Sequence, residues 1–173
     1  YELDVALEAL ARVAASRPAV TFHLDVYGRG DAAQDWRHLA ASLGLADRVT
    51  FHGRIAIEEM PTAIAAADIG LAPTRRTSFT DVSLSTKVFE YGAMAKPVIA
   101  TKLPMVEATF PPGTVWTYEP GDAASLASAI ESVLDDPAAR ERAVSATTAV
   151  VRERSWEREV PRYLDLIDRL ARD

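Results

Sequence analysis

The sequence predicts an α/β domain built on a parallel sheet that is flanked by helices. Amphipathic segments alternate along the 173 residues with short apolar runs, which is the order expected of successive β–α–β units. Apolar residues make up 49% of the chain and charged residues 25%, so the chain can bury a sizeable core. No repeat, low-complexity segment or linker divides it, and residues 1–173 therefore form one predicted domain.

The first half of the chain predicts helices and strands in turn. Apolar residues at helical spacing from Leu3 to Val13 predict a first helix, which Pro18 ends. Alternating polar and apolar residues predict a strand over 21–27, and a tight turn at 28–31 follows it. The next elements are a helix over 32–43 with Gly44 in the C′ position, a strand over 49–52 ending at Gly53, a helix over 57–67 and a buried strand over 68–73.

The second half begins with a polar loop over 74–83. A helix over 85–95, a strand over 97–101 and a short strand over 115–118 follow in that order, and the remainder is helical. Three helix starts are predicted from capping residues, which are Asp122, Asp136 followed by Pro137, and Ser155. The final helix carries apolar residues at helical spacing, namely Trp156, Val160, Tyr163, Leu164, Ile167 and Leu170.

Charge and composition exclude several function classes. The net charge of −6 and the pI of about 5.1 argue against a nucleic-acid partner held by phosphate contacts. The lack of cysteine excludes disulfides, thiol nucleophiles and thiolate metal sites. No apolar run approaches the roughly 20 residues of a membrane-spanning helix, and the first residues do not form a signal peptide. We expect a cytoplasmic protein, and we leave open a peripheral membrane association of the full-length protein.

The stretch from Ser83 to Thr101 carries the chemistry. Its Ser/Thr-rich entrance to a helix leaves several backbone N–H groups free to point at an anion. Lys87 adds a positive charge in the first turn, and Glu90 lies about one turn further, with its side chain leaning back toward the helix start. A phosphate site beside a hydroxyl acceptor is what a ribose diphosphate requires. The alternative is ordinary helix capping by Ser and Thr beside a solvated face.

The same stretch closely resembles the core motif of the group 1 retaining glycosyltransferases of GT-B fold. That motif is written as a lysine, two residues and then Glu-Tyr-x-Ala-x-Gly-Lys-Pro-Val, and it stands here from Lys87 to Val98. Weaker likenesses occur along the chain in the family's order, at residues 26–30, 45–53, 66–73, 120–122 and 155–156. The resemblance implies a Rossmann-like sheet, the C-terminal half of a GT-B fold.

The resemblance also implies roles for particular residues. The family's glutamate in this helix binds the ribose hydroxyls of the nucleotide, which indicates Glu90 here. The amides before it receive the diphosphate. Implied diphosphate contacts are Ser85, Thr86 and Lys87; implied contacts of the base are Arg54 and Ile55; and implied residues of the first glycine turn are Gly28 and Gly30, which could equally form a simple turn.

The sugar contacts depart from the family pattern. Many relatives carry a second glutamate eight positions before Glu90, and that position is Val82 here, with Asp81 and Ser83 beside it. The segment before Glu107 lacks the paired glycines of the family, so Glu107 is a candidate sugar contact only. The sequence therefore predicts a nucleotide site more firmly than a sugar site.

The residues at the end of the motif helix are small. Ala95 stands where the family usually has glycine. Gly92, Ala93 and Ala95 are expected to let the helix lie close against the sheet.

The resemblance implies that parts of the relatives lie outside this sequence. The first residues resemble the first helix of the family's C-terminal domain, so we expect its first strand, its Arg/Lys clamp and the N-terminal acceptor domain to be absent. In a doubly wound sheet of order 3-2-1-4-5-6 that strand is central, and its absence would leave unpaired backbone groups in a gap.

We expect the full-length protein to transfer a hexosyl group from a UDP- or GDP-sugar to an acceptor, in glycan or glycolipid synthesis. No metal or other cofactor is expected, and His23, His38 and His52 are assigned structural or surface roles. Two alternatives remain, which are another GT-B enzyme such as a sugar-nucleotide epimerase, and a non-catalytic interaction module. Exposed strand edges would favour self-association in the second case.

Overall fold

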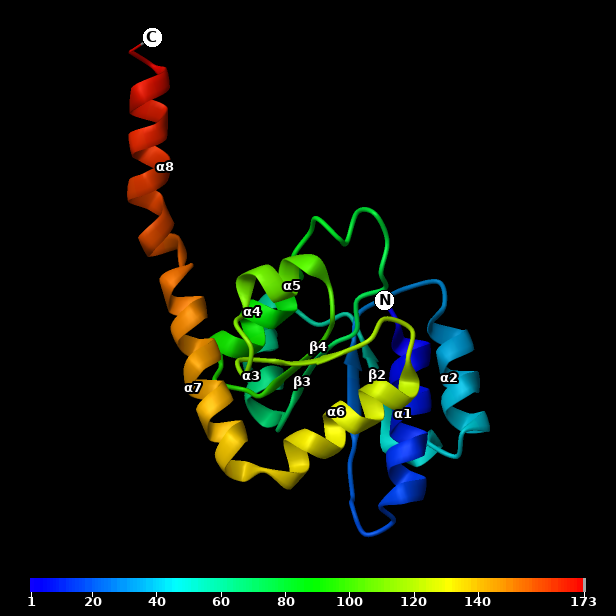
Figure 1. The fold of residues 1–173 in the computed structure, drawn as a ribbon. Coiled ribbons are helices and arrows are strands. Elements are labelled where there is room, and N and C mark those ends of the chain that lie inside the picture. The colour runs from blue at the N-terminus through cyan, green and yellow to red at the C-terminus, as the bar shows by residue number, and fades with distance from the viewer. Residues whose placement is uncertain (173) are drawn as a thin grey trace.

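The computed structural model describes residues 1–172 and contains two parallel sheets surrounded by helices (Figure 1). The first sheet pairs β1 (Leu24–Tyr27) with β2 (Val49–Gly53). The second has the order β3 (Gly70–Ala72), β4 (Val98–Thr101) and β5 (Trp116–Tyr118). All three pairings are parallel, which confirms the predicted fold class.

Helices connect and cover these strands. Their bounds are α1 (Leu3–Ser16), α2 (Ala33–Ser42), α3 (Met60–Ala66), α4 (Thr86–Ala93), α5 (Pro104–Thr109), α6 (Ala123–Asp135), α7 (Pro137–Glu153) and α8 (Trp156–Leu170), with 3-10 turns η1 (Ala46–Arg48) and η2 (Ile57–Glu59). The short helix α5 has no counterpart in the sequence prediction, because a six-residue helix offers too few apolar positions to show a period.

The main core lies around α1, which packs against both α6 and α2 (Figure 1). Leu7 and Val13 of α1 are fully buried in this core together with Leu126 and Val133 of α6. A smaller core lies beneath α4 and α5 and includes Val88 of α4. The apolar residues at helical spacing in the first helix are therefore the ones that it buries, as its amphipathic pattern predicts.

The two sheets are separate, as the expected gap predicts. Within residues 1–172 no strand pairs with β1 on the side away from β2, or with β3 on the side away from β4. The order β2-β1 and β3-β4-β5 agrees with the order 3-2-1-4-5-6 when its central position is left empty.

Two of the three predicted capping residues cap a helix through their side chains. Asp122 Oδ1 accepts from the backbone N–H groups of Ala124 and Ser125 at 2.8 and 3.0 Å. Asp136 Oδ1 accepts from Ala139 N–H at 2.8 Å. Ser155 occupies the N-cap position of α8, but its side chain makes no capping hydrogen bond to the helix.

The small residues at the end of α4 do not have the role that the sequence predicts. Gly92 packs against α7, because an added Cβ would lie 2.8 Å from side-chain atoms of Thr147 and Val151. Ala93 and Ala95 are exposed. The close approach of α4 to the sheet instead depends on Gly70 of β3, whose α-carbon lies against the ring of Tyr91.

Ala95 adopts a left-handed backbone conformation with φ of 52°. This conformation favours glycine, which explains physically why a glycine suits this position after a helix.

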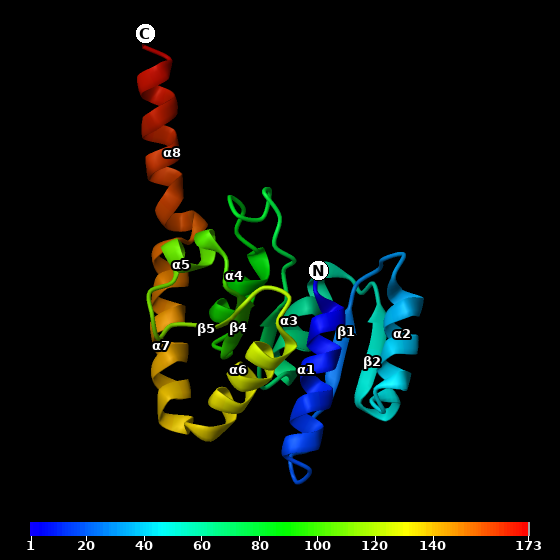
Figure 2. The same cartoon turned by 45° about the vertical axis from the view of Figure 1, so that its right-hand side comes forward.

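The last helix leaves its apolar residues exposed. Trp156 and Leu170 are 66% and 65% exposed, and α8 extends away from the rest of the molecule in both views (Figures 1 and 2). Among the helices of residues 1–172, none combines the length and the apolarity that crossing a membrane requires.

Candidate functional site

The loops that follow β1 and β3 lie at the same edge of the molecule as the N-terminus (Figure 1). This edge is formed by the carboxyl ends of the parallel strands, where open α/β sheets bind their ligands. The polar loop after β3 runs from Thr74 to Ser85 and leads directly into α4.

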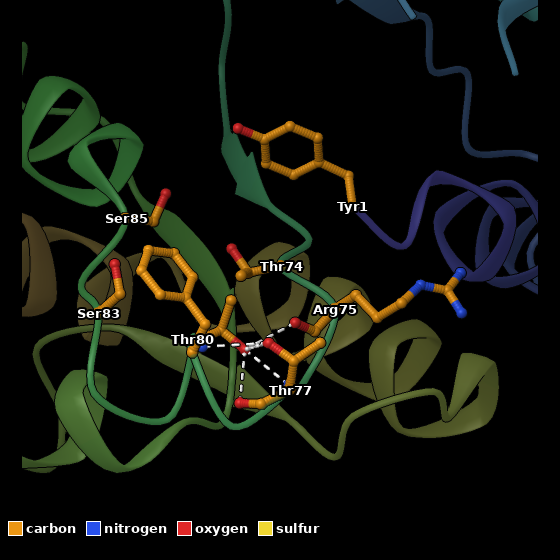
Figure 3. Close-up of a pocket in the computed structure, with 8 residues that line it drawn as sticks. Tyr1, Thr74, Arg75, Thr77, Thr80, Ser83 and Ser85 are labelled. Atoms are coloured by element: carbon orange, nitrogen blue, oxygen red, sulfur yellow. Dashed lines mark hydrogen bonds between the residues drawn. The ribbon is translucent and has the colours of Figure 1, made fainter. Parts of the chain in front are cut away.

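A pocket of about 380 Å³ lies between this loop and the first residue of the chain (Figure 3). Most of its lining side chains carry a hydroxyl group. The lining residues are Tyr1, Thr74, Arg75, Thr77, Phe79, Thr80, Ser83 and Ser85. Such a wall offers hydrogen bonds to a polar ligand without a carboxylate that would repel an anion.

Hydrogen bonds inside the loop order it without any ligand. Thr77 and Thr80 bond reciprocally through their backbone N–H groups and hydroxyl oxygens, at 2.7 and 3.2 Å. Thr80 Oγ1 also donates to the carbonyl of Arg75 at 2.8 Å. Arg76 Nε donates to Asp81 Oδ1 at 2.9 Å, so this carboxylate, which lies next to Val82, is engaged by an arginine.

The entrance of α4 presents free backbone donors. Ser85 is the N-cap residue in an extended conformation, and its side chain makes no capping bond. No acceptor in the described part of the chain receives the N–H groups of Ser85, Thr86 or Lys87, whereas Val88 N–H bonds to the Ser85 carbonyl at 3.3 Å. Free N–H groups at a helix start are the donors that an anion site uses.

Lys87 and Glu90 lie on this helix, and Lys87 contacts Tyr1 of the pocket wall. Lys87 Nζ donates to the Tyr1 hydroxyl at 2.8 Å and lies 4.4 Å from the centroid of its ring. Glu90 is exposed, and its carboxylate takes part in none of the ion pairs between described residues. Burial, and secondarily the charge of Glu90, raises the pKa of the neighbouring Tyr91 to about 12.

The other predicted site residues form a second group at the same edge. Gly28 N–H donates to the Gly53 carbonyl at 2.7 Å, which joins the turn after β1 to the end of β2. Gly28, Gly30 and Arg54 are exposed and Ile55 is half-buried. The pocket beside α4 includes Ser85 but none of these four residues.

Glu107 lies in the first turn of α5 and is exposed. The hydrogen bond of Lys102 to Glu119 at 2.7 Å, followed by the charges of Glu119 and Glu107, raises the pKa of Lys102. Glu107 therefore remains close to a cation but lines no part of the pocket beside α4.

Sequence reasoning missed most of the pocket wall. The sequence predicts only a polar loop for Thr74, Arg75, Thr77 and Thr80, and only the start of a helix for Tyr1. A usable signal was present, because a hydroxyl-rich loop after a buried parallel strand lies at the ligand-binding edge of such sheets. Tyr1 had no local signal, since only the tertiary fold brings it to this loop.

The histidines lie away from the pocket. His52 Nε2 is 2.6 Å from Asp25 Oδ1, and its ring stacks on Tyr27 with centroids 4.5 Å apart. His23 bonds to Thr50 and His38 to Gln34, and all of these contacts are exposed. Across residues 1–172, no group of three or more His, Asp or Glu side chains is arranged to hold a metal ion.

Residues 1–136 match the family described as "Glycosyl transferases group 1". The chain is similar to D-inositol 3-phosphate glycosyltransferase of Geodermatophilus obscurus, with 32% identity over 91% of this chain and 35% of that protein. It is similar also to a GDP-mannose-dependent monoacylated alpha-(1-6)-phosphatidylinositol monomannoside mannosyltransferase of Corynebacterium glutamicum, with 33% identity over 89% of this chain and 40% of that protein.

Solved structures share the fold. Anabaena HepE in complex with UDP and glucose superimposes with a TM-score of 0.79 and 21% identity, over 98% of this chain and 44% of that one. Sucrose-phosphate synthase of Thermosynechococcus elongatus gives a TM-score of 0.78 and 27% identity, over 95% and 42% of the two chains. The chain thus spans less than half the length of these relatives, and its fold is that of one half of a GT-B glycosyltransferase.

Proposed function

The chain belongs to the group 1 glycosyltransferase family, and we propose that it binds the nucleoside diphosphate of a nucleotide-sugar donor. The observation that carries this proposal is the entrance of α4, where free backbone donors, Lys87 and an exposed Glu90 carboxylate follow one another within about one helical turn. Few ligands require an anion site and a hydroxyl acceptor at this spacing, and a ribose linked to a diphosphate is one of them.

Each part of the proposed ligand has a chemical counterpart. The diphosphate accepts hydrogen bonds from the amides of Ser85, Thr86 and Lys87, and the positive end of the helix dipole favours its charge. Lys87 Nζ leaves the Tyr1 hydroxyl, 2.8 Å away, to pair with a phosphate oxygen. Glu90 accepts hydrogen bonds from the ribose hydroxyls, which is a charge-assisted contact.

The base and the sugar occupy the neighbouring loops in this proposal. Arg54 and Ile55 line the base at the end of β2, and the turn at Gly28 and Gly30 lies beside them. Glu107 contacts the transferred sugar from α5. The hydrogen bond between Gly28 and Gly53 supports this arrangement because it keeps the two turns together.

For the full-length protein we propose transfer of a hexosyl group from a UDP- or GDP-sugar to an acceptor held by a second domain. The names of the relatives support this range of donors, because one is GDP-mannose-dependent and HepE has been solved with UDP-glucose. We propose that this transfer needs no metal or further cofactor and takes place in the cytoplasm. Positive groups and amides around the diphosphate would stabilise the leaving group electrostatically.

The test is calorimetric titration of the chain with UDP, GDP and ADP, before and after the change Glu90→Ala. Loss of a hydrogen bond to a charged group costs about 1.5–3 kcal/mol, so the preferred nucleotide should bind roughly tenfold or more weakly. Glu141→Ala is the matched control, because Glu141 is an exposed glutamate of α7, an element that contributes no residue to the pocket beside α4. Equal affinities of the wild-type chain and Glu90→Ala for every nucleotide would contradict the assignment of Glu90.

A further inference from the structure

A chain of buried and partly buried hydrogen bonds runs from Thr74, which lines the pocket, to Glu2. Thr74 N–H donates to Thr101 Oγ1 at 2.9 Å, and Thr101 Oγ1 donates to the Tyr118 hydroxyl at 2.8 Å. The Tyr118 hydroxyl donates in turn to Glu2 Oε2 at 3.3 Å. Glu2, Thr101 and Tyr118 are 4%, 0% and 1% exposed, so these bonds are shielded from water.

The protons of this chain allow only one direction. The Glu2 carboxylate can only accept, so the Tyr118 hydroxyl gives its single proton to that bond, and the Thr101 hydroxyl must then donate to Tyr118 while accepting from Thr74 N–H. Gly121 N–H donates to the same oxygen at 3.2 Å. Burial, together with the nearby Glu2 charge, raises the pKa of Tyr118 despite the opposing hydrogen bond from Thr101, so its hydroxyl stays protonated. Bonds aligned in this way polarise and strengthen one another.

The two ends of the hydrogen-bond chain lie at or next to residues that line the pocket. Thr74 begins the hydroxyl-rich loop and lines the pocket, and Tyr1, which also lines it, directly precedes Glu2 (Figure 3). A further bond from Glu2 N–H to the Pro73 carbonyl at 2.8 Å joins the same two segments. The segments that carry Tyr1 and Thr74 are therefore joined by buried groups that are not part of the pocket lining.

We propose that Glu2, Thr101 and Tyr118 are positioning residues that hold the two walls of the pocket at the separation required for donor binding. This inference rests on the proposed function, in which the amide of Ser85, a residue that lines the pocket, binds the diphosphate. The three side chains act through Thr74 and Tyr1, and none of them touches the ligand.

If Thr101 only stabilised the fold, removing its hydroxyl should have the same effect as removing any other buried threonine hydroxyl. The chain offers such a threonine as a matched control. Thr147 is also a fully buried threonine whose hydroxyl donates a hydrogen bond, in this case to the Thr114 carbonyl. It lies in α7, where its methyl group faces Gly92 near the C-terminal end of α4, and it lines no part of the pocket. Thr147→Val and Thr101→Val therefore remove the same chemical group from equally buried places.

The experiment compares wild type, Thr101→Val, Thr101→Ser and Thr147→Val by two measurements. The first is amide hydrogen exchange of residues 73–85 in the ligand-free chain, which reports local opening of the loop. The second is UDP affinity by calorimetry. We expect Thr101→Val to speed exchange in the loop and to weaken UDP binding about fivefold, with Thr101→Ser restoring both and Thr147→Val changing neither.

The two measurements separate this proposal from the proposed function. Exchange in the loop that is equally slow in Thr101→Val and wild type would overturn the positioning role, whatever the affinity. Faster exchange with unchanged UDP affinity would overturn it as well, because the wall would move without consequence. If the wild-type chain bound no nucleotide while Thr101→Val still exchanged faster in the loop, the proposed nucleotide binding would be contradicted. The role of Thr101 in holding the loop would still be supported.

Discussion

The two sheets of this molecule differ sharply in how their strands are buried. All four residues of β4 in the three-stranded sheet are at most 1% exposed. In the two-stranded sheet no residue of β1 is buried, and one face of β1 and β2 carries the exposed pair Asp25–His52. β4 has a partner strand on each edge, whereas β1 has a partner on one edge only, and a parallel strand that is covered on both faces becomes buried along its whole length.

The functional features follow the same division. The three-stranded half carries α4, the hydroxyl-rich pocket and the buried chain of hydrogen bonds. The two-stranded half carries the glycine turn at Gly28 and the segment after Gly53, which are joined by one backbone bond. The pocket and its supporting hydrogen bonds thus belong to the half of the molecule whose central strand is fully buried.

The largest expected difference between the two sheets is in the stability that is lost when a strand side chain is truncated to alanine. Ile99→Ala in β4 removes a side chain that is 1% exposed and should lower the free energy of unfolding by about 2–5 kcal/mol. Leu24→Ala in β1, at a half-buried position, should lower it by less than half as much. Urea denaturation of both variants measures this, and equal losses would mean that the two halves are equally packed.

A second difference concerns two glycines, one in each sheet. Gly70 avoids a steric contact, whereas Gly53 adopts a positive φ. An added Cβ at Gly70 would lie 2.3 Å from the Tyr91 ring, so Gly70→Ala must displace α4 and should cost about 1–3 kcal/mol. Gly53→Ala meets no atom within 4 Å but places alanine at φ +74°, which costs about 1 kcal/mol. Thermal unfolding checks the order, and calorimetry should show weaker UDP binding for Gly70→Ala because α4 carries Lys87 and Glu90. If Gly70→Ala changed neither the thermal stability nor the UDP affinity, the result would argue against tight packing between α4 and β3.

Alkaline pH should lower the folding stability through two tyrosines that pack in the three-stranded half, Tyr91 and Tyr118. The pKa of Tyr91 is raised from 10.0 to about 12, and the pKa of Tyr118 is also raised. Above pH 10 the unfolded chain loses these protons while the folded chain keeps them, so stability is complete below pH 10 and falls as the pH rises toward 12. The slope is at most about 1.4 kcal/mol per pH unit for each tyrosine.

Urea denaturation at pH 9, 10 and 11 tests this sign. Tyr91→Phe should lose stability less steeply than wild type between pH 10 and 11. Parallel curves for the two proteins would show that Tyr91 does not contribute to the alkaline loss.

The smallest effect is expected on the exposed face of the two-stranded sheet. Asp25→Asn removes the charge that faces His52 at 2.6 Å, but both side chains are about one-third to one-half exposed. Solvent screens such a pair, so the free energy of unfolding should change by less than about 1 kcal/mol. A loss above 2 kcal/mol in urea denaturation would mean that this face is not simply solvated.

Most of the fold could be predicted because its signals are local. The buried strand ending at Pro73, the aspartate caps at Asp122 and Asp136, and the helix entrance at Ser85 are each readable within a few residues. Helix α5 was missed because it is too short to show a period. The expectation that Gly92 serves the sheet was wrong, since a glycine reveals that something lies close but not which element it is.

The candidate site also has one part that local sequence predicts and another that it does not. Ser85, Thr86, Lys87 and Glu90 are contiguous, so helix geometry alone places their amides and side chains together. Their role as nucleotide contacts stays a prediction, as do those of Gly28, Gly30, Arg54, Ile55 and Glu107. The pocket wall at Tyr1 could not be predicted, because nothing near it in the sequence indicates which loop it meets.

The sequence by itself determined the order of the elements and the chemistry of the α4 entrance, because both depend on spacings shorter than two helical turns. Only the tertiary structure decided which groups share the pocket and what supports it. Glu2 and Tyr118 are 116 residues apart, and their hydrogen bond exists because parallel strands bring their carboxyl ends to one edge beside the start of α1. A bond of that range leaves no periodic trace in the sequence, since each partner taken alone is an ordinary residue at the end of a helix or strand.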